Sequence, residues 1–230
     1  MTGHIKKLGL MGVSALALSL FIGSGNASAT TPDQHQQNWQ QQTQQDQAYQ
    51  ATHQQSQQVN HELHMKLDAS MREHAALGVA YLKAAYLNEP DTAALAAVVE
   101  QNNMAVINAV GTAYPWAHDE FAVLWNAHIG YYKEYLMAAA AHDEAGKMQA
   151  KEKLAGFAWQ VTNLLTQTDQ DSLDWEQTRM ALVIHGEQVT HIIDYLVAGQ
   201  YDAVWMTAHE AYEHMGMVAH VLAMGAPHQY

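Results

Sequence analysis

From Val59 onward the chain carries a continuous helical pattern, and this pattern limits the fold more than any other feature. Apolar residues recur at spacings of three and four, and no segment combines strand alternation with turn residues. Breaks rich in Asn, Gly, Pro and Ser divide the pattern into six predicted helices at 60–87, 91–112, 116–142, 146–167, 172–198 and 201–224. Asp91 and Ser172 are predicted N-caps, and Gly199 is a predicted C-terminal stop. The sequence therefore predicts an all-α helical bundle with a four-helix-bundle-like core.

The six predicted helices align as three related antiparallel hairpins, which suggests an internal repeat. An offset of 111 residues lays the first hairpin on the third, and an offset of 54 lays it on the second. The positions that match are His74, Asn103, His128, Phe157, His185 and His214. Within each hairpin the matched pair is 29 residues apart, so both members lie about 21 Å from the turn at a rise of 1.5 Å per residue. Stacking the hairpins in parallel then places the matched residues in one layer, in which histidine predominates.

This histidine layer is the predicted functional site. Several buried imidazoles are costly unless each has a partner, and one metal ion supplies all of them with a partner. Met217 lies three residues after His214 on the same helix, and imidazole with thioether suits copper. The predicted metal ligands are His74, His128, His185, His214 and Met217. The sequence does not identify any catalytic residue. The alternative to a metal site is a layer of histidines that hydrogen-bond to one another without metal.

The N-terminus has the order of a secretory signal. Lys6 and Lys7 precede an apolar stretch at 8–22, and Ala27-Ser28-Ala29 follows. The apolar stretch is shorter than the roughly twenty residues that a spanning helix needs. We therefore predict that 1–29 is a cleaved signal peptide and that the protein is exported, to a periplasm or to the extracellular medium.

The remaining chain divides into three predicted parts. Residues 30–58 are dominated by Gln and have few aliphatic side chains, so they are predicted to form a flexible segment that could carry a frayed helix. The helical-bundle domain is predicted at 59–226, followed by a tail at 227–230.

Charge and cysteine content narrow the partners. The chain has 10 basic and 23 acidic residues and no cysteine, and its net charge of −13 becomes −15 without the two lysines of 1–29. An acidic surface disfavours nucleic acid and anionic membrane and attracts cations, and thiolate ligands are excluded. The predicted partner is a metal ion, and a homodimer is compatible with the sequence.

Four short motifs give the chain a resemblance to known proteins. They are Glu73-His74, Leu124-Trp125-Asn126-Ala127-His128-Ile129, His185 with Ile193-Asp194, and His214-Met215-Gly216-Met217. Over about residues 65–225 the chain resembles a group of exported bacterial helical-bundle proteins that are often described as copper-related. The resemblance implies copper as the ion and His74, His128, His185 and His214 as the matching positions, with Asn103 and Met217 nearby. It also implies the alternative of a copper-dependent superoxide dismutase, an activity suggested within that group.

Other functions stay open from the sequence. Arg72 is one of few basic residues and is the candidate for guiding superoxide to a dismutase site. A di-iron site of the hemerythrin or ferritin-like kind would use Glu73 and the pairs Glu187/His191 and Glu210/His214, but inward carboxylates are few. Haem and zinc are further alternatives, as is an interaction bundle without metal. His61 and His64 form a second cluster, for which solvated surface histidines are expected and an auxiliary weak metal site is the alternative.

Overall fold

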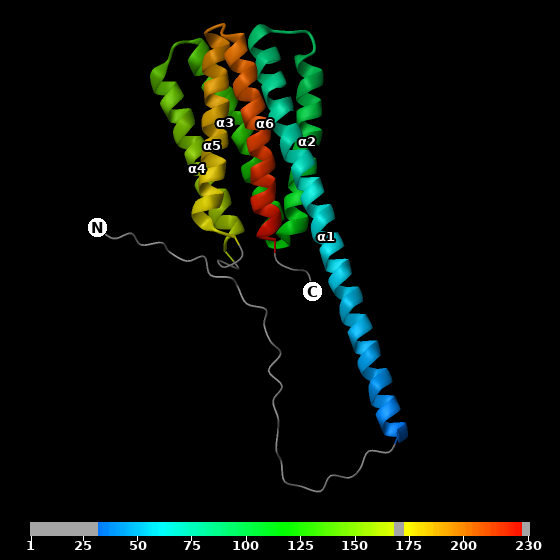
Figure 1. Ribbon diagram of the computed structural model, residues 1–230. Helices are drawn as coiled ribbons and strands as arrows, with labels where there is room; N and C mark the ends of the chain where they lie inside the picture. The colour runs from blue at the N-terminus through cyan, green and yellow to red at the C-terminus, as the bar shows by residue number, and fades with distance from the viewer. Residues whose placement is uncertain (1–31, 168–172, 227–230) are drawn as a thin grey trace, which may run out of the picture. The chain divides into compact units, whose positions relative to one another are not determined.

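Six α-helices, joined by short connections, make up the part of the chain that the structure describes. The computed structural model describes residues 32–167 and 173–226, and these ranges contain no strand. The helices are α1 (Pro32–Leu87), α2 (Thr92–Ala113), α3 (His118–Ala140), α4 (Glu144–Leu165), α5 (Trp175–Val197) and α6 (Tyr201–Met224), with the 3-10 turn η1 (Pro115–Ala117) before α3. Figure 1 shows the helices side by side in a bundle, so the predicted all-α bundle is confirmed.

The N-terminal part of α1 differs from the prediction. The helix begins at Pro32, whereas the sequence led us to expect a flexible segment at 30–58 and a helix from residue 60. Gln is a good helix former, and no Gly or Pro interrupts the chain between Pro32 and Val59. Proline is also favoured at the first position of a helix. The predicted signal peptide (1–29) and tail (227–230) lie outside the described residues.

The helix ends show which local signals act. Gly199 has a φ of 71°, and the next amide, that of Gln200, donates to the Tyr195 carbonyl at 2.9 Å. This is the left-handed stop predicted after the fifth helix. The N-cap of α5 is Asp174, whose carboxylate accepts from the Gln177 amide at 2.6 Å, while the predicted cap Ser172 lies outside the described residues. Asp91 precedes α2 as predicted, but its side chain makes no capping hydrogen bond.

Consecutive helices pair as hairpins and then pack on one another. Helix α3 packs on α4 and α5 packs on α6, while α2 contacts α3, and α5 contacts both α3 and α4. In the first hairpin the Asn102 side chain on α2 donates to the Ser70 carbonyl on α1 at 3.0 Å. The Tyr114 hydroxyl donates to the Leu222 carbonyl at 2.7 Å and so joins the end of α2 to α6. The three-hairpin arrangement follows, whereas the internal sequence repeat stays a prediction.

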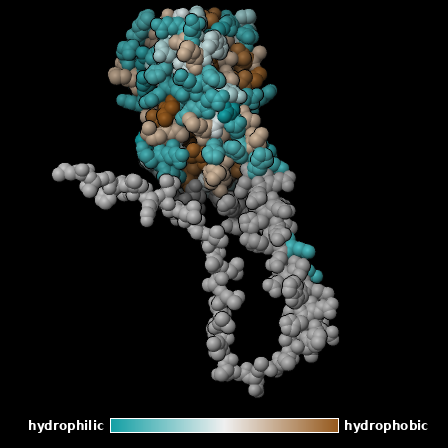
Figure 2. Space-filling model, viewed as in Figure 1, coloured by the Kyte–Doolittle hydropathy of each residue, from teal (hydrophilic) through white to brown (hydrophobic). Residues whose placement is uncertain are grey.

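The core of the bundle contains large aromatic residues, whereas most of the methionines are exposed. Trp125, Phe121, Tyr114 and Tyr135 are almost fully buried. Figure 2 shows polar residues over most of the visible face, with apolar side chains scattered among them. The exposed methionines are Met65, Met104, Met137, Met148, Met180, Met206, Met217 and Met224. Among the described helices, none has the length and apolar character needed to cross a membrane.

Candidate metal centre in the helical core

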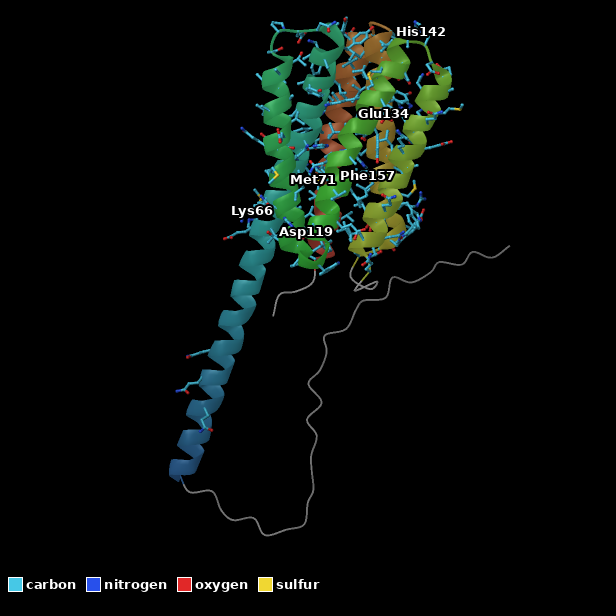
Figure 3. The ribbon with its side chains drawn as sticks, turned by 180° about the vertical axis from the view of Figure 1, so that it is seen from behind. Lys66, Met71, Asp119, Glu134, His142 and Phe157 are labelled. Atoms are coloured by element: carbon cyan, nitrogen blue, oxygen red, sulfur yellow. The ribbon has the colours of Figure 1, made fainter. Side chains whose placement is uncertain are left out.

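The predicted layer lies inside the bundle. All six matched positions are buried: His74, Asn103, His128, Phe157, His185 and His214. In Figure 3, Met71 on α1 and Phe157 on α4 lie at the same level, between Asp119 near the start of α3 and His142 beyond its end. His74 follows Met71 by less than one helical turn. Six helices therefore each contribute one residue near the middle of the bundle.

Two of the imidazoles face each other directly. The Nε2 atoms of His74 and His128 are 3.4 Å apart. Two nitrogens that bind one tetrahedral ion at 2.0–2.1 Å lie about 3.3–3.4 Å apart, so this separation equals that of two ligands of a shared ion. Within the layer, His74 and His128 are therefore already at the spacing of two ligands of one ion.

The protonation state of His128 is set by the backbone. Its Nδ1 contacts the Trp125 carbonyl, and a carbonyl can only accept, so Nδ1 carries the proton. The Nε2 atom of His128 then presents a lone pair towards His74 in the neutral ring. A backbone carbonyl that holds the distal nitrogen in this way is the usual support of a metal-binding histidine.

Several polar atoms around this pair have no partner. Within residues 32–167 and 173–226, the buried side-chain atoms without a hydrogen bond are His74 Nδ1, Asn102 Oδ1, Asn103 Oδ1, Trp125 Nε1, His185 Nδ1 and Gln188 Oε1. The ring centre of His185 is 6.0 Å from that of His74. Unpaired buried polar groups are rare in folded proteins and costly. Three of these six residues belong to the predicted layer. Unpaired polar atoms of this kind are expected where side chains that bind an ion lack that ion.

Burial keeps the imidazoles neutral. Loss of solvation lowers the pKa of His74 to about 4, against the opposing effect of the Asn102 and Asn103 amides. It lowers the pKa of His185 to about 3 and that of His128 well below the ordinary value of 6.5, and the neighbouring histidines add to both shifts. At neutral pH these rings are therefore in the form that binds metal.

His214 is buried but already has a partner. Its Nε2 donates to the Ala181 carbonyl on α5 at 2.8 Å. Like the other three imidazoles, it comes from the layer position of its helix, but this ring nitrogen points to the backbone rather than to a neighbouring ring. In this tautomer Nδ1 carries the lone pair, so His214 could join a ligand set only through Nδ1.

Met217 does not belong to the layer. Its side chain is 59% exposed, whereas Met215 is fully buried. Two residues correspond to a rotation of about 200° around a helix axis, so the two methionines face opposite sides of α6. The structure therefore does not bring Met217 together with the four buried histidines, and its ligand role stays a prediction.

The surroundings of the pair are aromatic. Phe157 stacks on His128 with ring centres 4.7 Å apart and 15° between planes, and Trp125 lies 4.7 Å from His74 and 4.5 Å from His128. A narrow cavity between His74, His185 and Tyr132 leaves about 20 Å³ for the centres of water molecules. This space holds about one water and has no room for a haem.

Carboxylates stay outside the layer. Glu73, Glu187 and Glu210 are all exposed. Glu73 reaches the core only indirectly, because its carboxylate accepts from the Asn102 amide at 3.0 Å. Within the described residues, no three His, Asp or Glu side chains already meet at one point. Neither the carboxylate-rich di-iron site nor a complete three-histidine site is therefore assembled among the described residues.

Arg72 is held by neighbours on two helices. Its guanidinium donates to Asp68 and to Glu213, both at 2.9 Å, and lies over the Tyr212 ring at 5.1 Å. Two carboxylates neutralise its charge, so the residue considered for superoxide guidance serves as a bridge between α1 and α6.

The comparisons with known proteins add no relative: no family model, curated protein or solved structure matches this chain.

Proposed function

We propose that this is an exported metal-binding protein that holds one copper ion in its helical core for sequestration or delivery. The ligands would be the Nε2 atoms of His74 and His128 together with the His185 imidazole. The observation that carries the proposal is the 3.4 Å separation of the two Nε2 atoms, with the His128 proton held on the opposite nitrogen by Trp125.

The unpaired amide oxygens beside His74 would hold the ring of this ligand in place. A ligating histidine donates its other N–H to a carbonyl or carboxylate, which orients the ring. Both the Asn102 and Asn103 amides act on the His74 pKa, so they lie beside this ring, and both have an unpaired oxygen. A small rotation of either amide would let His74 Nδ1 donate to it.

The ligand type favours Cu(I) among the candidate ions. Three neutral imidazoles leave the full charge of the ion in a buried, aromatic site, and burying a double charge costs far more than burying a single one. Imidazole accepts copper in both oxidation states, whereas iron sites in bundles rely on inward carboxylates. Zinc also accepts three histidines, so Zn(II) is the competitor to exclude.

Holding copper is a better fit than turnover. The cavity beside His74 and His185 admits about one water, and the Arg72 charge is already paired with Asp68 and Glu213. A superoxide dismutase would need an open coordination position and an approach favourable to an anion. Neither the small cavity nor the paired charge of Arg72 supports a superoxide dismutase.

A competitive titration with a chromophoric Cu(I) chelator under reducing conditions tests the proposal. We expect one tight equivalent per chain, weakened more than about 100-fold in His128→Ala and His185→Ala, since even loss of a group that only hydrogen-bonds a ligand costs about 10–100-fold. His128→Gln serves as a second variant where alanine unfolds the chain. The matched control is His209→Ala, which removes an exposed histidine on α6. Unchanged affinity in folded His128 variants, or tighter binding of Zn(II) than of Cu(I), would overturn the proposal.

A further inference from the structure

Two histidines from opposite ends of the sequence meet on the bundle surface. His64 on α1 and His220 on α6 have ring centres 5.4 Å apart, with 71° between their planes. His220 is exposed and His64 is half-buried. Two imidazoles that bind one ion at 2.0–2.1 Å have ring centres about 5–6 Å apart, so the spacing of this pair permits both rings to bind one ion.

Exposed methionines flank His220 along α6. Met217 is three residues before it and Met224 four residues after it, so all three lie on one side of the helix. Their exposed fractions are 59% for Met217 and 71% for Met224. Methionine usually fills gaps in a core, and these two side chains have no such role because they lie in solvent.

We propose that His64 and His220 form a second, surface copper site that takes Cu(I) and is completed by the thioether of Met217 or Met224. Thioether sulfur is a soft ligand that selects Cu(I), and imidazole accepts the same ion. The ligands lie at the bundle surface on two different helices, so we expect the ion to exchange with solvent. The site is independent of the buried centre, because it shares no residue with it.

The two sites are separate in space. His64 precedes His74 by ten residues on α1, and His220 follows His214 by six residues on α6. Helices α1 and α6 run in opposite directions (Figure 1), so both surface histidines are displaced towards the same end of the bundle, by about 15 Å and 9 Å along their helices. One ion cannot contact both sets of ligands.

The test is a Cu(I) titration of the unmodified chain carried beyond one equivalent, with a weak competing chelator. We expect a second, weaker equivalent that falls at least tenfold in affinity in His64→Ala and in His220→Ala, while His209→Ala leaves it unchanged. In the double variant Met217→Leu/Met224→Leu, Cu(I) binding should weaken while Ni(II) binding at the same histidines persists.

The outcomes separate this site from the buried one. Loss of the weaker equivalent in the His64 and His220 variants supports the surface site even if no tight equivalent is found. A weaker equivalent that persists in both variants, or its absence from the unmodified chain, overturns it. Equal weakening of Cu(I) and Ni(II) in the double methionine variant would contradict the thioether ligand.

Discussion

The Nε2 atoms of His74 and His128 lie 3.4 Å apart in the bundle core, and the second nitrogen of His128 is bound to the Trp125 carbonyl. The backbone thus fixes which nitrogen of His128 faces His74. Because α1 and α3 each contribute one ring, their packing sets the separation. Without an ion, the two Nε2 atoms would form a weak hydrogen bond. With an ion present, both atoms would bind it.

The metal-free chain should lose stability in mild acid. The unfolded chain protonates its histidines near pH 6.5, whereas burial lowers the folded pKa of His74 to about 4 and of His185 to about 3. Stability is therefore unaffected above pH 6.5 and falls as the pH drops from 6.5 towards 4, by about 1.4 kcal/mol per pH unit for each such histidine. Urea unfolding with chelator at pH 7.5, 6 and 5 measures this slope. His185→Gln should reduce it, and an equal slope in the variant would contradict the assignment.

His214 should matter less for copper than His128. Its Nε2 donates to the Ala181 carbonyl, so its removal deletes a hydrogen bond between α5 and α6 and leaves a cavity in place of a buried ring. We expect His214→Ala to lower Cu(I) affinity less than tenfold and to lower the free energy of unfolding by about 1–3 kcal/mol. Paired chelator titrations and urea unfolding measure both effects. A loss of affinity as large as that of His128→Ala would make His214 a ligand.

A substitution at Asn103 should distinguish a metal site from a histidine layer that has only a structural role. Its side-chain oxygen is buried without a partner in the metal-free chain, so replacing it with an apolar group of similar size should cost little stability or even raise it. By accepting a hydrogen bond from the His74 ring in the metal site, it should contribute about 10–100-fold to metal affinity. Asn103→Leu is therefore expected to weaken Cu(I) binding and to leave the melting temperature of the metal-free chain unchanged or higher. Unaltered affinity would remove Asn103 from the site.

Gly216 makes room for Arg72. A Cβ at Gly216 would lie 2.1 Å from Arg72 Nη2, so an alanine there must displace the guanidinium from Glu213 and Tyr212. Alanine alone should favour the helix by about 1 kcal/mol over glycine. We expect Gly216→Ala to stabilise the chain only when Arg72→Ala is also present, with a coupling energy of about 0.5–3 kcal/mol between neighbours. A double-mutant cycle in urea measures the coupling, and additive effects would show that Gly216 is not needed to make room for Arg72.

Local sequence patterns were enough for the helices after residue 59 and for the layer. The breaks at Asn88-Glu89-Pro90, Pro115 and Gly199 terminate helices through residues that disfavour helix, and this effect is local. The corresponding helices end within two residues of these breaks. Matching positions in three hairpins placed His74, His128, His185 and His214 in the interior because periodicity records which face of each helix is apolar.

Other features depend on contacts that no local pattern records. Met217 is exposed because of the way α6 is rotated about its axis against the neighbouring helices. Its spacing of three residues from His214 did not determine that rotation. The Trp125 carbonyl as partner of His128, and the Ala181 carbonyl as partner of His214, depend on side-chain rotation within the packed core. The contact between His64 and His220 joins helices at opposite ends of the chain.

X-ray absorption at the copper edge tests the central claim most directly. The sample is the His64→Ala/His220→Ala variant, which lacks the proposed surface pair, loaded with one equivalent of Cu(I). The account predicts a copper ion bound by three imidazole nitrogens with no sulfur ligand, and loss of that spectrum in the same variant carrying His128→Gln. A copper ion bound by sulfur, or a spectrum that His128→Gln leaves unchanged, would contradict a copper centre in the histidine layer.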